Sequence, residues 1–319
     1  MTPRKVLVTG GAGFIGSHVA DAYIARGDRV WVVDDLSSGR RENVPAEATF
    51  VQLDIGDPEL EAVFRDAGGF DIVNHHAAQI DVRKSVADPR YDARINVDGL
   101  LNVLELARRH GTRRVLFVSS GGVVYGEPEV RPTPETTAKQ PLSPYGVSKL
   151  TAEYYLQYYH RIHGLEYVAM RYSNVYGPRQ DPYGEAGVVA IFSTRLMRGE
   201  PLTVFGDGEQ TRDYIFVGDV VAANMLLTDQ PIAGDEGLDT RAFNVGTGRE
   251  TSVNTLARTL MEAVGRETEL EYAPARPGEV LHSCLDASKL RGLGWTPAAT
   301  LHEGLGQTYQ FIAGQGTGR

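Results

Sequence analysis

The chain has 319 residues, a formal net charge of −9 at pH 7, 42% hydrophobic and 23% charged residues, and one cysteine, Cys284. This composition is typical of a globular protein of one large or two modest domains, and the acidic balance without a long basic run disfavours a nucleic-acid partner. No apolar run approaches the roughly 18 residues of a membrane span, so we expect no membrane partner. We also expect no signal peptide before the first strand, and a single cysteine allows no internal disulfide. These features together predict a cytoplasmic protein.

The first predicted unit is a strand, a glycine-rich turn and a helix. Residues 6–8 are a short apolar run typical of a buried strand, and residues 18–25 have the apolar spacing of a helix. Between them stands Gly10-Gly11-Ala12-Gly13-Phe14-Ile15-Gly16. Glycines permit a tight turn and close approach of the backbone to a pyrophosphate, and the helix N-terminus offers its N–H groups to the phosphates. The turn therefore predicts a dinucleotide site.

An acidic residue indicates which dinucleotide binds. A second strand is predicted at residues 29–33, and Asp34 ends it. A carboxylate at this position accepts hydrogen bonds from the adenosine ribose 2′-OH and repels a 2′-phosphate. Arg40 and Arg41 are the residues that would favour NADP. Asp34 argues for NAD.

The first half of the chain alternates strand and helix. Further strands are predicted at residues 49–53, 71–74, 114–119 and 167–171, with helical patterns such as 97–110 between them. This alternation predicts an α/β fold with a doubly wound parallel Rossmann sheet, whose ligands bind beyond the carboxyl ends of the strands. That edge gathers Asp54, residues 75–78, Ser119, Ser120 and residues 172–174.

The second half has a different texture, because loops rich in glycine, proline and charge separate short elements. We predict an NAD-binding domain at residues 1–175 and a smaller α/β substrate-binding domain at residues 176–319. Residues 215–227 and the strand 242–245 are expected to return to the main sheet, within a returning segment near 215–246. No metal site is expected, because His75 and His76 point to opposite faces of a strand end and no carboxylates cluster with them.

Tyr145 and Lys149 form the second strong signal. They lie one helical turn apart and therefore on one helix face. A tyrosine pKa near 10 is too high for a general base at neutral pH, but a nearby ammonium and the positive nicotinamide of NAD⁺ both favour the phenolate. Lys149 can also reach the nicotinamide ribose. The alternative is a packing helix, because Tyr154, Tyr155, Tyr158 and Tyr159 follow on the same segment, but beside a dinucleotide turn the pair favours catalysis.

Taken together, these motifs resemble the extended short-chain dehydrogenase/reductase family. The resemblance rests on the glycine turn, Asn96, Tyr125-Gly126 and the Tyr145–Lys149 pair. Residues 171–177 and 212–215 resemble its branch acting on nucleotide sugars, and residues 276–279 and 286–289 resemble the C-terminal signature of UDP-glucose 4-epimerases. The resemblance implies NAD-dependent 4-epimerisation of a UDP-sugar: hydride leaves C4, the 4-keto sugar rotates, and hydride returns to its other face.

One position departs from the family pattern. The family places Ser or Thr four residues before the tyrosine of its Tyr-Gly motif, where the hydroxyl bridges the substrate O4 and the catalytic tyrosine. Here Gly121 stands there. Three alternatives remain open: Ser120 or Ser119 reaches across the glycines, Tyr145 contacts O4 directly, or a water substitutes.

The next two residues favour one reaction over its relatives. Dehydratases of the family need an Asp-Glu pair after that hydroxyl, and decarboxylases a glutamate, but this chain has Gly122 and Val123. Without that acid–base group dehydration has no evident mechanism, so epimerisation is favoured. The alternatives are a nucleotide-sugar reductase or dehydrogenase that exchanges free NAD(P)H, and a non-catalytic NAD-binding regulator, which the Tyr145–Lys149 pair disfavours.

The resemblance also implies roles for individual residues. The catalytic residues would be Tyr145, Lys149 and Ser120. The NAD site would comprise Gly10, Gly13, Phe14, Ile15, Gly16, Asp34, Asp35, Leu36, Ser37, Ser38, Gly39, Asp54, Ile55, His76, Ala77, Ala78, Gln79, Asn96, Ser119, Tyr145, Lys149 and Tyr172. The UDP-sugar would contact Ser120, Gly121, Tyr145, Asn174, Thr203, Phe205, Arg212, Arg276 and Ser283.

Two further expectations concern substrate size and assembly. The small side chain of Ser283 falls at the family's gate for the sugar and would leave space for a 2-acetamido group, so the N-acetylglucosamine pair is expected beside the glucose pair. The helices at 145–159 and 97–110 suggest a homodimer through a four-helix bundle, an inference that leans on the family.

Overall fold

The computed structural model describes residues 3–181, 187–234, 236–275 and 280–316. The chain divides into two compact units. Unit 1 comprises Met1–Gly126, Ala138–Arg171 and Val221–Phe243, and unit 2 comprises Glu127–Thr137, Tyr172–Val220 and Asn244–Arg319. No helix within the described ranges is long and apolar enough to cross a membrane.

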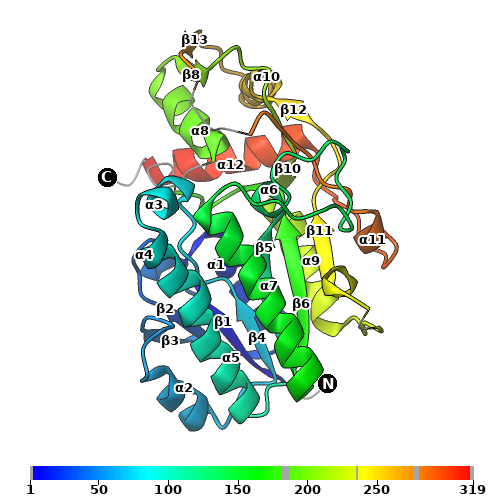
Figure 1. Cartoon of the computed structure of the whole chain (residues 1–319). Helices are drawn as coiled ribbons and strands as arrows, with labels where there is room; N and C mark the ends of the chain where they lie inside the picture. The colour runs from blue at the N-terminus through cyan, green and yellow to red at the C-terminus, as the bar shows by residue number, and fades with distance from the viewer. Residues whose placement is uncertain (1–2, 182–186, 235, 276–279, 317–319) are drawn as a thin grey trace. The chain divides into compact units, whose positions relative to one another are not determined.

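A seven-stranded parallel sheet is the centre of the fold, in the order β11-β6-β5-β4-β1-β2-β3 (Figure 1). Its strands are β1 (Lys5–Thr9), β2 (Arg29–Asp34), β3 (Thr49–Gln52), β4 (Ile72–His75), β5 (Arg114–Ser120), β6 (Glu166–Tyr172) and β11 (Ala242–Val245). Strand β1 pairs with β2 on one side and β4 on the other. The predicted doubly wound parallel sheet is confirmed, because the chain starts in the middle and builds outward in both directions.

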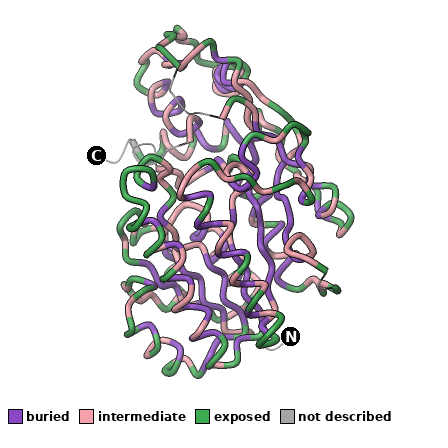
Figure 2. The backbone as a smooth tube through the Cα atoms, in the orientation of Figure 1, coloured by how far each residue is buried: buried purple, intermediate pink, exposed green. Residues whose placement is uncertain are grey.

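Helices cover both faces of this sheet. Leu7, Val73 and Val115 pack with α2 (Leu60–Ala67), α5 (Gly99–Arg109) and α7 (Pro144–His163) in one apolar cluster. Asn74 points to the opposite face, where it binds Asn224 of α9 (Val217–Asp229), and Tyr23 of α1 (Phe14–Ala25) binds Thr228. Figure 1 shows α5 and α7 side by side, and Figure 2 shows the buried strands beneath them.

Further short elements of unit 1 follow β4 and β5. They are α3 (Val82–Ala87), α4 (Pro89–Ala93), a π-helical turn (Arg94–Asp98) and α6 (Gly121–Val124). The π-helical turn overlaps the first two residues of the helix that was predicted at 97–110. The first helix begins at Phe14 rather than residue 18, because its opening turn already belongs to the glycine motif.

Unit 2 is built from short strands and four helices described in the structure. Its strand pairs are β7 (Asn174–Tyr176) with β10 (Tyr214–Phe216), and β13 (Leu270–Ala273) with β8 (Leu202–Phe205). A third sheet has the order β12 (Thr251–Ser252), β9 (Thr211–Arg212) and β14 (His282–Ser283). The helices are α8 (Val188–Arg198), α10 (Val253–Val264), α11 (Ser288–Arg291) and α12 (Leu301–Gly316). Phe192, Leu256 and Leu305 centre its core.

One sequence expectation about the sheet is wrong. Ile215 was expected to return to the main sheet, but β10 pairs with β7 instead. Only the later part of that segment, from Val221 in α9, belongs to unit 1. Strand β11 does join the central sheet as expected. The apolar run 214–217 is compatible with a strand in the central sheet and with a strand paired to β7. Apolar periodicity does not reveal which strand is the pairing partner.

Candidate active site

The glycine turn between β1 and α1 is packed against the segment that follows β4. Gly10 has φ +67°, and a Cβ on it would lie 2.5 Å from the backbone nitrogen of Ala77. A Cβ on Gly16 would collide with the carbonyl oxygen of Gly10. Both positions therefore require glycine, because the turn leaves no space for a side chain between neighbouring backbone segments.

The first turn of α1 presents backbone donors. Gly13 precedes the helix in an extended conformation and supplies no side-chain cap. The opening N–H groups of a helix have no intrahelical partner and carry its positive dipole end. A tight cradle that excludes a Cβ and ends on such donors fits the pyrophosphate of a dinucleotide.

Asp34, at the end of β2, closes the same turn. Its carboxylate accepts hydrogen bonds from Ala12 N and Leu36 N, both at 2.9 Å. Burial raises the pKa of this carboxyl and the backbone donors oppose that rise. Leu36 has φ +61°, a left-handed conformation that is strained for this residue type. Asp34 thus shapes the loop in addition to facing the turn.

The loop after Asp34 folds back on the glycine turn. The Asp35 carboxylate accepts from Ser37 N at 2.9 Å and from Ser37 Oγ at 2.6 Å. A Cβ on Gly39 would lie 2.7 Å from Asp34 Oδ1, and Arg40 N donates to Ala12 O at 2.9 Å. The predicted residues 34–39, Ser38 among them, are therefore one compact loop beside the turn.

Residues after β3 and β4 line the same edge. The Asp54 carboxylate accepts from Gly56 N at 2.7 Å, whereas the neighbouring Ile55 is buried in the core. His75 Nδ1 bonds Thr9 Oγ1 at 2.9 Å. Burial lowers the pKa of His75 and of His76 to about 3, so both rings are neutral at physiological pH. Within the described residues no three metal-ligating side chains come together.

Gln79 and Asn96 are locked to each other. Gln79 N donates to Asn96 Oδ1 at 2.9 Å, and Asn96 Nδ2 donates to Gln79 O at 2.9 Å. Asn96 lies in the π-helical turn, a local irregularity that is frequent at functional sites. The pairing fixes the segment 76–79, which includes Ala77 and Ala78, at the carboxyl edge of the sheet.

Helix α7 places Tyr145 and Lys149 together. Ser143 caps the helix by accepting from Gly146 N at 3.2 Å, which sets Tyr145 in its first turn. Lys149 Nζ lies 5.8 Å from the centre of the Tyr145 ring and donates to Val118 O at 2.9 Å. Burial lowers the pKa of Lys149 to about 8, while the carboxylates of Asp92 and Glu153 oppose the fall. The side chains are adjacent, as the helical spacing predicts.

The two serines at the end of β5 face different surroundings. Ser119 is buried, and its hydroxyl donates to Glu153 Oε1 at 2.6 Å. Glu153 also forms a fully buried ion pair with Arg171 at 2.6 Å. Ser120 is half-buried and directly precedes α6, which begins at Gly121. The Ser119 hydroxyl is therefore committed to the interior, and Ser120 is the hydroxyl next to the missing one.

In unit 2, three predicted substrate residues, Asn174, Arg212 and Ser283, lie on strands next to Asp213, which has a buried carboxylate. That carboxylate accepts from Thr247 N at 2.9 Å and Gly248 N at 3.1 Å. Asp213 O accepts from Asn174 N at 2.9 Å, and β9 sets Arg212 beside Ser283 of β14. The same network was not predicted from the sequence, although Asp213 stands inside the motif at 212–215.

Other predicted residues are placed separately or not described. Thr203 and Phe205 lie on β8, where Thr203 Oγ1 accepts from Arg195 Nη1 at 2.5 Å. Tyr172 is buried at the end of β6. Arg276 and the rest of residues 276–279 lie outside the described residues.

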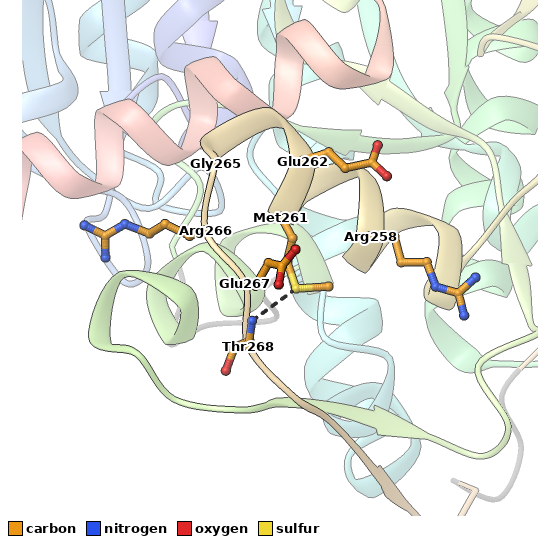
Figure 3. Close-up of a pocket in the computed structure, with 7 residues that line it drawn as sticks. All are labelled: Arg258, Met261, Glu262, Gly265, Arg266, Glu267 and Thr268. Atoms are coloured by element: carbon orange, nitrogen blue, oxygen red, sulfur yellow. Dashed lines mark hydrogen bonds between the residues drawn. The ribbon is translucent and has the colours of Figure 1, made fainter.

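A depression at the end of α10 contains none of the predicted site residues. It has a volume of about 570 Å³, and Figure 3 shows Arg258, Met261, Glu262, Gly265, Arg266, Glu267 and Thr268 around it. Its one drawn hydrogen bond joins Thr268 N to Met261 Sδ at 3.4 Å. Charges of both signs surround it, so it offers no concentrated site for an anionic nucleotide sugar.

Comparison with known proteins decides the family. Residues 6–246 match the model of the NAD dependent epimerase/dehydratase family. The chain belongs to this family. The matched range contains the glycine turn, the Tyr145–Lys149 pair and Asp213 itself, whereas its partners Thr247, Gly248 and Leu285 lie beyond it.

Relatives within the epimerase/dehydratase family align along nearly the whole chain. The UDP-glucose 4-epimerase of Mycolicibacterium smegmatis is 44% identical over 314 residues, covering 97% of this chain and 98% of that protein. The crystal structure of UDP-glucose 4-epimerase with UDP-glucose from Thermotoga maritima is 48% identical, with a TM-score of 0.92, and covers 98% of this chain and 99% of that one. The crystal structure of the Thermus thermophilus UDP-glucose 4-epimerase in complex with NAD is 44% identical, with a TM-score of 0.89. The match covers 97% of this chain and 99% of that one.

Sequence reasoning missed the buried polar residues behind this family's tyrosine–lysine motif. Glu153 and Asp92 are buried and lie near Lys149, yet neither was singled out. Glu153 stands one helical turn after Lys149, so the spacing of Tyr145, Lys149 and Glu153 was a usable signal. Asp92 comes from a different element, and nothing in its local pattern marks it.

Proposed function

We propose that this chain is a UDP-glucose 4-epimerase, which interconverts UDP-glucose and UDP-galactose with NAD as a recycled cofactor. The observation that carries the proposal is the adjacent Tyr145–Lys149 pair in the unit that also contains the glycine turn, with Gly122 and Val123 where dehydratases need acids. The family match and the likeness to epimerases that bind NAD and UDP-glucose support it.

The residues of unit 1 fit the cofactor. The glycine turn and the opening N–H groups of α1 would hold the pyrophosphate, and Asp34 would accept from the adenosine ribose. Lys149, Asn96, Gln79 and the segment 75–78 would hold the nicotinamide half, with Asp54 and Ser119 at the edge. When bound there, NAD would supply the hydride acceptor for C4 of the sugar and, after reduction, the hydride donor to its opposite face.

Tyr145 acts as the base for the 4-hydroxyl. The ammonium of Lys149 stabilises the phenolate, which brings the Tyr145 pKa toward the working pH. The Val118 carbonyl holds one Lys149 N–H bond, which orients the ammonium. The same tyrosine returns the proton when the 4-keto group is reduced, so proton and hydride both balance over a cycle.

Ser120 contributes the hydroxyl that Gly121 lacks. Its half-buried position at the start of α6 supports this role, and the hydrogen bond from Ser119 to Glu153 disfavours Ser119 as the alternative. Ser120 would bind the sugar O4, and the absence of a side chain at Gly121 leaves room for that contact.

The residues of unit 2 bind the UDP part and the sugar. Arg212 and Arg276 would hold the diphosphate, where guanidinium groups match phosphate oxygens. Asn174 would bind the diphosphate or sugar, and Thr203 and Phe205 would lie near the uracil. These roles are transferred from the family motifs.

Ser283 extends the substrate range to the N-acetylglucosamine pair. It is buried on β14, and its small side chain leaves space beside the sugar. We expect turnover of UDP-N-acetylgalactosamine within roughly tenfold of UDP-galactose. Product analysis with both substrates tests this, and an enzyme inactive on the acetylated sugar would contradict it.

A homodimer through α5 and α7 is the proposed assembly. Val147, Tyr154, Tyr158 and Ile162 form an apolar stripe along one side of α7, each about half or more exposed. Helices α5 and α7 of each protomer would together make a four-helix bundle. The cytoplasmic location expected from the sequence stays a prediction.

The test of the proposed function uses purified protein and UDP-galactose. We expect UDP-glucose to accumulate to equilibrium without a stoichiometric rise in absorbance at 340 nm, because the hydride never leaves the enzyme. Tyr145→Phe should reduce the rate by roughly 100-fold or more, since it removes the base, and Tyr154→Phe should not. Unchanged UDP-galactose, or equal rates for Tyr145→Phe and the unaltered protein, would contradict the proposal.

A further inference from the structure

Asp92 is a fully buried carboxylate in α4 that the proposed reaction does not yet use. Its Oδ1 accepts from Gln79 Nε2 at 2.9 Å and from Asn96 Nδ2 at 3.0 Å, and its Oδ2 accepts from Ser148 Oγ at 2.6 Å. We call these four residues the Asp92 cluster. All three donors are neutral side chains.

The Asp92 cluster connects two parts of the candidate site. Gln79 and Asn96 belong to the edge assigned to the cofactor and are locked together by two hydrogen bonds. Ser148 immediately precedes Lys149 on α7. A single carboxylate therefore links the helix that carries Tyr145 and Lys149 to the cofactor edge.

Hydrogen bonding alone does not require Asp92 to be charged, since burying a carboxylate is costly and an amide could take part in similar hydrogen bonds. The nearby ammonium of Lys149 provides an electrostatic role for the charge. Two carboxylates, Asp92 and Glu153, favour the charged form of this buried ammonium. Glu153 is ion-paired with Arg171 at 2.6 Å, which offsets much of its charge. Asp92 receives only neutral donors from its cluster, so its field acts on Lys149 with less compensation.

The other titratable groups around Lys149 do not replace this effect. Tyr145 lies on the same helix, and His75 and His76 come from β4 and the residue after it. Burial lowers the pKa of both histidines to about 3, so they are neutral across the range in which Lys149 titrates. Among the described residues, Asp92 and Glu153 are the carboxylates that favour the ammonium form of Lys149.

We propose that Asp92 is a positioning residue of the epimerase reaction, which holds Lys149 as an ammonium and fixes α7 against the Gln79–Asn96 pair. This inference rests on the proposed function. It predicts a loss of turnover and a change in how the activity depends on pH, which a purely structural carboxylate would not produce.

The decisive variant is Asp92→Asn, compared with Asp98→Asn, which removes the same charge from an exposed position on the adjoining π-helical turn. Activity requires protonated Lys149 and falls as the pH rises through its pKa. Removing the Asp92 charge lowers that pKa, so the alkaline limb of the kcat profile should move to lower pH, by about one unit. We expect kcat to fall roughly 10- to 100-fold. Asp98→Asn should match the unaltered protein.

Two more variants separate the effect of the Asp92 charge from the effect of its hydrogen bond with Ser148. Ser148→Ala removes the hydrogen bond to α7 but keeps the carboxylate, so kcat should fall while the alkaline limb stays in place. Asp92→Glu keeps the charge and displaces it by a methylene, so it should behave likewise. This variant also provides the test if Asp92→Asn does not fold, because unchanged kcat in Asp92→Glu would refute the positioning role.

A measurement without turnover keeps the result independent of the proposed function. The ¹³C chemical shift of the Lys149 side chain, assigned with Lys149→Arg, reports its titration in the NAD-loaded protein. Asp92→Asn should lower its midpoint, whereas an unchanged midpoint and alkaline limb would overturn the inference, even with a lower Tm. If the unaltered protein fails to convert UDP-galactose, the proposed function is refuted, and the Lys149 titration still decides whether Asp92 controls its charge.

Discussion

Ser119 and Ser120 are adjacent residues with different surroundings, because successive side chains of β5 point to opposite faces. The Ser119 hydroxyl donates to the buried Glu153, whereas Ser120 is half-buried at the start of α6. The pattern Ser-Ser-Gly-Gly left both serines as candidates for the missing hydroxyl. The structure favours Ser120 by giving Ser119 another partner.

Single substitutions distinguish the two serines. Ser120→Ala should reduce kcat by roughly 100-fold, because it removes a donor to the reacting oxygen, with little change in stability. Ser119→Ala should instead lower the free energy of unfolding by about 1.5–3 kcal/mol, since it removes a hydrogen bond to a buried charged group. Steady-state kinetics and urea unfolding of both variants measure these effects. The reverse pattern would assign the hydroxyl role to Ser119.

At this scale the sequence identifies residues whose spacing is local and misses those whose partners are distant. Tyr145 and Lys149 were recognisable from helical spacing, and they are adjacent in the structure. Asp92 was not recognisable, because its partners Gln79 and Ser148 come from other parts of the chain. The sequence does not show that a carboxylate is buried, because burial depends on hydrogen-bond partners that only the folded chain brings together.

Among the elements, the unit β1–turn–α1 is the one that the sequence predicts most completely. Apolar residues, glycines and helical spacing occur in the order that the structure needs. Gly10 and Gly16 are required by contacts within the turn and with Ala77. By contrast, the π-helical turn at 94–98 was not foreseen, because such turns are rare and apolar spacing is compared with the regular helical period.

Alanine substitution at two glycines tests this element. Gly10 and Gly27 both have positive φ, but a Cβ on Gly10 meets the backbone of residues 76 and 77 whereas one on Gly27 meets nothing within 4 Å. Gly27→Ala should cost about 1–2 kcal/mol of stability and retain NAD. Gly10→Ala should lose bound NAD and destabilise the protein further. NAD content per chain and Tm measure both, and a Gly10→Ala protein that retains NAD would contradict the account.

On the scale of the whole molecule, the parallel sheet was predictable and the partner of Ile215 was not. Alternating strand and helix patterns allow few topologies. A three-residue strand such as β10 carries too little periodicity to choose between two sheets, and its pairing with β7 is decided by tertiary contacts. The substrate residues of unit 2 were likewise identified by motif and not by geometry.

The proposed dimer gives a prediction at the same scale. Tyr154 and Tyr272 are each 56% exposed, but only Tyr154 lies on the α7 stripe. Tyr154→Glu should convert a dimer into a monomer, because it places two charges in an apolar bundle, while Tyr272→Glu should leave the dimer intact. Sedimentation equilibrium distinguishes these outcomes. A monomeric unaltered protein, or a dimeric Tyr154→Glu variant, would exclude this interface.

In the proposed reaction, hydride leaves C4 and returns to the same carbon without exchanging with solvent or free cofactor. UDP-galactose carrying deuterium at C4, incubated with the NAD-loaded protein in ordinary water, tests it most directly. We expect UDP-glucose that retains the deuterium at C4 with inverted configuration. Loss of deuterium to water, or its appearance in free NADH, would contradict it.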